Sequence, residues 1–207
     1  IGVLEYSPQY FESADPVRTC LEIACKALKP DGVLIIAIEN QLGLKYFTGC
    51  REDHVDIPFF GIEDRYDGKT AVTFGRRELT SLLNGQGLSR VEFHYPFPDY
   101  KIPKAVLTEK AFQENGFRPA EIIRQLRSRD YSGEFTPTFN EQLAALALCR
   151  NGLMPDLSNS FLVLASRKDS PLENLRDQDL LGAIYTTERH NAYNIRTQFI
   201  GSGDSIR

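Results

Sequence analysis

Six consecutive apolar residues, Val33 to Ile38, run directly into Glu39 and Asn40. A strand that is apolar at every position must be covered on both faces, which is typical of a parallel strand inside an α/β sheet. Ligands of open α/β sheets bind beyond the carboxyl ends of the strands. The run therefore predicts an interior parallel strand of an α/β sheet, with Glu39 and Asn40 facing a ligand crevice.

The 207 residues suffice for one sizeable core with room for an inserted subdomain. The net charge of −4 at pH 7 argues against a chain that grips nucleic acid through a basic face, so we expect no nucleic-acid partner. No apolar run approaches the roughly 18 residues of a membrane helix, and the first residues lack the basic start of a signal peptide, which together predict a cytoplasmic protein with no membrane span. The four cysteines lack CxxC spacing, so we expect reduced structural thiols and no metal site.

The remaining elements follow from capping residues and apolar spacing. Asp15 and Pro16 predict the start of a helix that runs to Leu28 with one apolar face. The turn at residues 30–32 then leads into the apolar strand. Further helices are predicted at about 76–84, 119–129 and 140–150, and further strands at 91–95 and 160–168.

Two long segments interrupt this pattern. Residues 41–74 are predicted to form an extended loop or a small inserted hairpin, and such a loop after a strand is often a lid or a binding loop. Residues 97–159 are predicted to be a helical insertion before the final strand. The polar tail at 169–207 is expected to be loosely held or to lead into a following domain.

Four segments resemble, in order, the carboxyl-terminal half of a class I S-adenosylmethionine-dependent methyltransferase. They are GVLEYS at 2–7, LKPDGVLIIAIEN at 28–40, RRELTSLLNGQGLSRVEF at 76–93 and SFLVLASRK at 160–168. They resemble the segment after the family's fourth strand, the turn into its fifth strand, the helix before its sixth strand, and its seventh strand. The resemblance implies that residues 1–168 form a partial Rossmann-like methyltransferase sheet in an α/β fold, with a helical insertion before the last strand, and that the cofactor is S-adenosylmethionine.

The resemblance also implies where the cofactor would lie. Leu4, Glu5 and Tyr6 match the segment near the methionine end of the cofactor and are the implied cofactor-binding residues. No G-x-G motif opens a helix in this sequence, so the glycine-rich turn that holds such cofactors is expected on an upstream segment. We therefore expect the 207 residues alone to be inactive. We also expect a strand edge that self-association into a homo-oligomer would cover.

The substrate side of the site is expected within this chain. Glu39 and Asn40 could orient the accepting group or act as a general base, and we predict them as the catalytic residues. Lys45, Tyr46 and Phe47 could wall the acceptor pocket and are the predicted substrate-binding residues. The competing interpretation is that Glu39 and Asn40 satisfy loop amides and that the aromatic residues are packing.

The acceptor class also comes from a resemblance. IENQLGLKYF at 38–47, EDHVDIPFFGIEDRY at 52–66 and YPFPDYKIP at 95–103 are similar to methyltransferase modules of bacterial surface-polysaccharide and glycosyltransferase systems. This implies a small-molecule acceptor related to sugars or polysaccharides.

Two other functions are compatible with the sequence. Asp53, His54 and Asp56 could suggest metal-dependent hydrolysis, but a ligand set needs converging geometry and these acids lie in a charged loop. The stronger alternative is a catalytically inactive methyltransferase-like module that serves as a binding or assembly domain.

Overall fold

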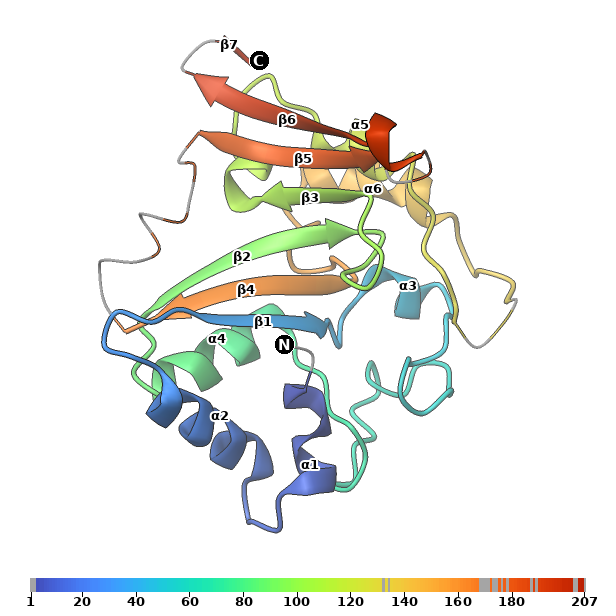
Figure 1. The fold of residues 1–207 in the computed structure, drawn as a ribbon. Helices are drawn as coiled ribbons and strands as arrows, with labels where there is room; N and C mark the ends of the chain where they lie inside the picture. The colour runs from blue at the N-terminus through green and yellow to red at the C-terminus, as the bar shows by residue number, and fades with distance from the viewer. Residues whose placement is uncertain are drawn as a thin grey trace.

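The computed structural model describes residues 3–131, 133, 135–167, 172, 175, 177, 179–186, 188, 190–202 and 205–206 (Figure 1). The strands are β1 (Leu34–Glu39), β2 (Arg90–Phe97), β3 (Ala105–Thr108), β4 (Ser160–Ser166), β5 (Leu180–Thr186), β6 (Ile195–Ser202) and β7 (Ser205–Ile206). The helices are η1 (Leu4–Tyr6), α1 (Ser7–Tyr10), α2 (Pro16–Ala27), α3 (Leu44–Phe47), α4 (Arg76–Gly85), η2 (Glu109–Phe112), α5 (Pro119–Ile123), α6 (Glu141–Arg150) and η3 (Asn191–Tyr193).

The fold is mixed α/β, as predicted, and is built on one seven-stranded sheet with the order β1-β4-β2-β3-β5-β6-β7. Each neighbouring pair of these strands is antiparallel. Since β4 is antiparallel to both β1 and β2, those two strands run in the same direction on either side of it. Figure 1 shows α1, α2 and α4 gathered near β1 and β4, with α5 and α6 behind β3 and β5.

The prediction that residues 33–38 pair as a parallel interior strand is wrong. In the described part of the chain, β1 stands at one end of the sheet and pairs with β4 in antiparallel register, with Leu34 opposite Ala165. Its apolar run is not covered equally on both faces, because Ile36 and Ile38 are buried whereas Ile35 is 46% exposed. The unbroken apolar run therefore led to a prediction of burial on both faces, whereas one face of this strand is partly exposed.

The predicted helices are mostly confirmed. The carboxylate of Asp15 accepts a hydrogen bond from the amide of Arg18 at 3.0 Å and caps α2 as expected. At the other end of α2, the guanidinium of Arg167 donates to the carbonyl of Leu28 at 3.1 Å. The helix predicted at 119–129 is shorter and ends at Ile123, so the following residues form an irregular segment instead.

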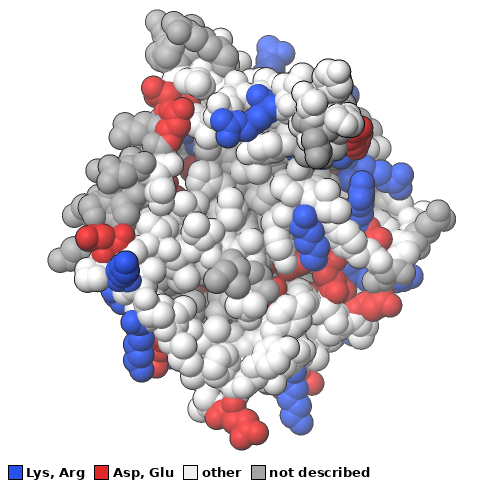
Figure 2. Space-filling model, viewed as in Figure 1, with Lys and Arg blue, Asp and Glu red and all other residues white. Residues whose placement is uncertain are grey.

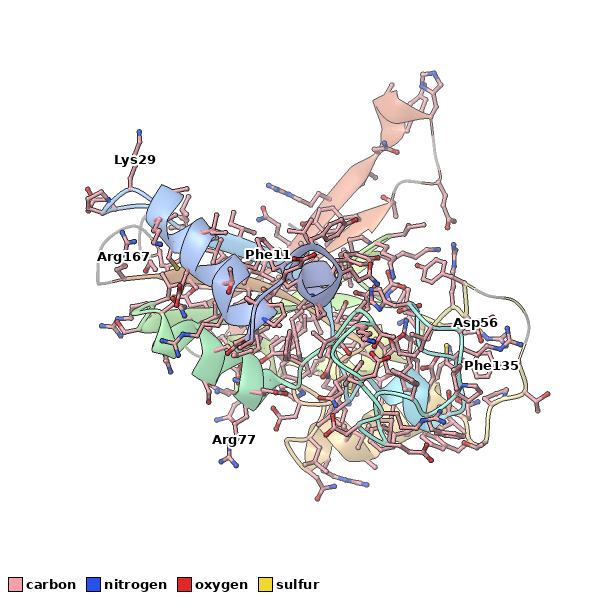
Figure 3. All side chains as sticks on the ribbon, turned by 90° about the horizontal axis from the view of Figure 1, so that it is seen from below. Phe11, Lys29, Asp56, Arg77, Phe135 and Arg167 are labelled. Carbon is pink, nitrogen blue, oxygen red and sulfur yellow. The ribbon has the colours of Figure 1, made fainter. Side chains whose placement is uncertain are left out.

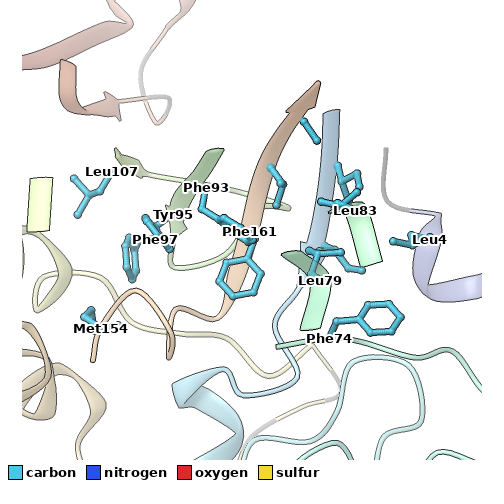
Figure 4. Close-up of a cluster of buried hydrophobic side chains, with 14 of the residues drawn as sticks. Leu4, Phe74, Leu79, Leu83, Phe93, Tyr95, Phe97, Leu107, Met154 and Phe161 are labelled. Carbon is cyan, nitrogen blue, oxygen red and sulfur yellow. The ribbon is translucent and has the colours of Figure 1, made fainter. Parts of the chain in front are cut away.

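The core lies where α2 and α4 pack against the first strands of the sheet (Figure 4). Phe161 of β4 is fully buried, and its ring makes edge contacts with the rings of Phe93 and Tyr95 at centroid separations of 5.2 Å and 6.3 Å. Leu79 and Leu83 of α4 are also fully buried. This core holds β1, β4 and β2 as a unit and fixes the ends of the strands from which the candidate site is built.

Much of the predicted tail forms strands that extend the sheet. Leu180–Thr186 pairs with β3, and Ile195–Ser202 pairs in turn with Leu180–Thr186, so these residues are not loosely held. Near the end of this predicted tail, Gly201 and Ser202 belong to β6, and Gly203 lies outside the described residues. None of the helices in the described ranges combines the length and apolar character that a bilayer crossing requires.

Candidate functional site

The carboxyl end of β1 carries Glu39, whose side chain is buried. The Nζ of Lys101 donates a hydrogen bond to its Oε1, and the hydroxyl of Tyr100 donates to its Oε2 at 3.3 Å. Tyr100 and Lys101 lie in the loop after β2, and since β1 and β2 run in the same direction, the chain leaves both strands at the same edge of the sheet. Figure 2 shows acidic and basic side chains meeting in a hollow on the face near this edge.

A tight turn at residues 52–55 presents an imidazole to Glu39. The Oε2 of Glu52 accepts hydrogen bonds from the amides of His54 at 2.8 Å and Val55 at 3.0 Å, while its Oε1 lies 2.8 Å from Nδ1 of His54. This geometry assigns the proton to Nδ1 and leaves Nε2 facing Oε2 of Glu39 at 3.9 Å. The ring of Tyr6 packs edge-on against the imidazole, with the centroids 5.2 Å apart.

A buried ion pair lies beside this turn. The Nζ of Lys45 is 2.6 Å from Oδ2 of Asp53, and the hydroxyl of Tyr46 donates to the same oxygen at 2.9 Å. The Nζ of Lys101 lies 3.6 Å from that oxygen and so joins Asp53 to Glu39. Burial alone would raise the pKa of Asp53, but the charge and hydrogen bond of Lys45 outweigh it and lower that pKa.

Glu5 is the least satisfied acid of the site. It is 1% exposed, and its Oε2 has no hydrogen-bond partner among the described residues. Burial, reinforced by the charge of Glu39, raises the pKa of Glu5. Burial disfavours the charged form of His54, but the hydrogen bond and charge of Glu52 outweigh it, so the pKa of His54 is raised.

These groups form one connected set, which we call the buried charge cluster. It contains four carboxyl groups, two ammonium groups and one imidazole, so its acidic groups outnumber its basic groups by one. Its members are Glu5, Glu39, Lys45, Glu52, Asp53, His54 and Lys101.

Asn40 was predicted as a catalytic residue. Both polar atoms of its side chain are hydrogen-bonded to backbone groups. Its Nδ2 donates to the carbonyls of Asp156 at 2.8 Å and Ser158 at 2.6 Å, and its Oδ1 accepts from the amide of Leu42 at 3.0 Å. These bonds tie the chain after β1 to the chain before β4. The contacts of Asn40 therefore match the competing interpretation, in which it satisfies loop groups.

The other predicted site residues separate into two sets. Leu4 is a buried core residue, and Phe47 is 38% exposed, with its carbonyl accepting from Thr138. The predicted residues that the structure does bring together are Glu5, Tyr6, Glu39, Lys45 and Tyr46.

Several site residues were not predicted. Asp53 and His54 were considered only as metal ligands together with Asp56, which instead pairs with Arg51 at the surface. Lys101 was not singled out, although its place after β2 could have marked it, because co-directional strands deliver their following loops to one edge.

A cavity of about 850 Å³ lies next to the buried charge cluster, and its size suits a small-molecule ligand. Tyr131 connects the two: it lines the cavity, its hydroxyl donates to Asp99 at 2.8 Å, and its ring centroid lies 5.0 Å from Nζ of Lys101 in the cluster. Figure 3 places Asp56 and Phe135 at the same end of the molecule, and the amide of Arg51 donates to Asp130 at 3.4 Å between the loops that carry them. Basic and aromatic residues of the lining include Lys104, Arg127, Arg129, Tyr131 and Phe135.

Comparisons of the chain with models of protein families, with curated proteins and with solved structures find no match.

Proposed function

We propose that this chain is the acceptor-binding part of an S-adenosylmethionine-dependent methyltransferase that acts on a small polar molecule. The observation that carries the proposal is the buried charge cluster at the carboxyl ends of β1 and β2, where the resemblance expects the reacting groups. The strand directions are compatible with it. The strand β4 lies between β1 and β2 and runs opposite to both. This is the arrangement expected if β1, β2 and β4 correspond to the family's fifth, sixth and seventh strands.

Methyl transfer needs few catalytic groups, because S-adenosylmethionine supplies an already activated methyl group. The protein must hold the acceptor in line and, for a hydroxyl acceptor, accept its proton. Glu39 and His54 are the proposed bases, since Nε2 of His54 faces Glu39 while Nδ1 is held by Glu52. Glu52 holds the imidazole in this orientation.

In this proposal, the 207 residues supply contacts to only one part of the cofactor. Glu5 and Tyr6 border the buried charge cluster and are the residues proposed to face the methionine end of the cofactor. The sequence has no glycine-rich turn for the rest of the molecule. We propose that this part of the cofactor site lies on a segment outside these 207 residues.

The adjacent cavity is the proposed acceptor site. Its volume suits a sugar-sized molecule, and its lining mixes the aromatic rings of Tyr131 and Phe135 with the basic side chains of Arg127 and Arg129. Such a lining could stack against a sugar face and bind its hydroxyls or an attached acidic group. This supports a carbohydrate-related acceptor.

The first experiment is a calorimetric titration of S-adenosylhomocysteine into the protein extended by its native upstream segment, with the 207-residue chain as control. Binding by the longer chain alone is the expected result. Absence of binding by both chains would contradict the proposal and favour the inactive binding or assembly module.

A second experiment tests the role of Glu39 in the extended protein. Glu39→Gln should lower turnover with labelled S-adenosylmethionine and a panel of sugar acceptors, while cofactor affinity stays nearly unchanged. Glu63→Gln is the matched control, because Glu63 is exposed and pairs only with nearby Arg65 in the described contacts. Unchanged turnover in Glu39→Gln would return Glu39 to a structural role.

A further inference from the structure

Glu5 and Glu39 place two carboxylates close together in a buried site. One carboxylate oxygen of each, together with a ring nitrogen of His54, lie within 4.8 Å of one another. Glu39 is partly neutralised by Lys101, but Oε2 of Glu5 has no partner among the described residues. A buried carboxylate oxygen without a partner is costly, and a cation would satisfy it.

The orientation of His54 points to the same kind of ligand. Its Nδ1 is held 2.8 Å from the carboxylate of Glu52, which leaves Nε2 facing Oε2 of Glu39 at 3.9 Å. A histidine that binds a metal usually donates its other ring N–H to a carboxylate or carbonyl, which fixes the tautomer and the ring. Glu52 is itself held by the amides of His54 and Val55, so this support is rigid.

We propose that Glu5, Glu39 and His54 form a binding site for one divalent transition-metal cation such as Mn²⁺. Two carboxylates and one imidazole suit Mn²⁺, Fe²⁺ or Zn²⁺ better than Ca²⁺, which prefers oxygen ligands throughout. Lys101 supplies the positive charge beside Glu39. The side chain of Lys101 is 35% exposed, so it can turn toward solvent when a cation enters.

The three candidate ligand atoms lie within 4.8 Å of one another, and one pair is closer. Nε2 of His54 and Oε2 of Glu39 are 3.9 Å apart. Two ligand atoms of a tetrahedral site with bonds of about 2.1 Å lie about 3.4 Å apart. A shift of roughly half an ångström therefore brings this pair to bonding geometry, which side-chain rotation can supply.

A cation here would affect catalysis as well, because a metal-bound hydroxyl loses its proton more readily. Glu39 would then act on the acceptor through the metal, so loss of turnover in Glu39→Gln does not distinguish the two roles. Cation binding does, since it is measured without cofactor or acceptor. A negative result for methyl transfer would not contradict cation binding at this site. Likewise, absence of cation binding would not contradict the proposed methyl transfer.

The experiment titrates Mn²⁺ into the protein and follows loss of the free-ion signal by electron paramagnetic resonance. One site per chain is expected. Glu5→Gln and His54→Gln should weaken binding at least tenfold, and Glu52→Gln should weaken it about 10–100-fold through the support of the imidazole. Lys101→Met should strengthen binding, because it removes the competing charge, whereas Glu63→Gln should leave it unchanged.

Circular dichroism of each variant establishes that the fold is retained before binding is compared. Absence of binding by the parent protein at about 1 mM Mn²⁺, the weak limit of known protein cation sites, would overturn the proposal. Equal binding by the parent and Glu5→Gln proteins would also overturn it. Weaker Mn²⁺ binding by the Lys101→Met protein would also overturn the proposal, because the ammonium group of Lys101 would then not compete with the cation.

Discussion

The Nζ of Lys45 lies 2.6 Å from Oδ2 of Asp53, and the two side chains are only 1% and 5% exposed. Neither charge reaches enough water to be solvated, so each depends on the other for stabilisation. Asp53 immediately precedes His54, and the ion pair therefore also fixes the turn that presents the imidazole. Stability and site geometry are coupled at this pair.

Replacing Lys45 by Met should lower the free energy of unfolding by about 3–5 kcal/mol, because it leaves a buried carboxylate without its main partner. Adding Asp53→Asn to Lys45→Met should recover part of the loss, since the uncompensated charge is gone. Urea unfolding followed by circular dichroism measures both. The matched control is Arg18→Met, which breaks an exposed pair with Glu22 and should cost at most about 1 kcal/mol. A loss of that small size in Lys45→Met would mean that the pair is not needed.

Phe161→Ala should be among the more destabilising substitutions in the core. The ring is fully buried and contacts the rings of Phe93 and Tyr95, so its removal leaves a cavity between β4 and β2, with a loss of about 3–5 kcal/mol. Phe161→Leu should cost less, because it fills part of that space. Leu143→Ala, at a position 60% exposed, should change stability by only about 0.5 kcal/mol. Similar losses at positions 161 and 143 would contradict the described core.

Local signals predicted the elements well, and long-range pairing much less well. The cap at Asp15 and the apolar spacing of Leu79 and Leu83 gave α2 and α4 close to their observed bounds. The prediction that β1 has a parallel neighbour was wrong. An apolar run indicates that a strand is buried, but it does not indicate which distant strand pairs with it or in which direction. The sheet residues beyond Leu180 were missed since their polar composition resembles a tail.

The candidate site was predicted from strand ends. Glu39 lies at the carboxyl end of β1, and its side chain is buried, while its catalytic role stays a prediction. His54 and Lys101 reach it from segments 15 and 62 residues away, and no periodic pattern records such a contact. Asn40 follows the same strand end, but its side chain binds backbone groups, and its position in the sequence does not indicate those contacts.

Asp15→Ala should shorten or fray the start of α2. The carboxylate of Asp15 accepts from the amide of Arg18, and loss of such a cap costs about 0.5–2 kcal/mol. Asp15→Asn keeps an oxygen acceptor and should retain most of that stability. Thermal unfolding compares the variants, and hydrogen exchange at residues 16–19 reports the local effect. Unchanged exchange there in Asp15→Ala would show that the cap contributes little.

His94 gives the fold a defined response to acid. Burial lowers the pKa of His94, and the opposing charge of Glu92 does not restore it. As pH falls below the ordinary histidine value of about 6.5, the unfolded chain takes up this proton before the folded chain does, so protonation favours unfolding. The contribution of His94 to stability is therefore complete above that value and is lost as pH falls through the lower pKa of the folded state. Urea unfolding of the parent and His94→Gln proteins between about pH 7.5 and 5 should show a smaller loss of stability in the variant, and equal losses would contradict the assignment.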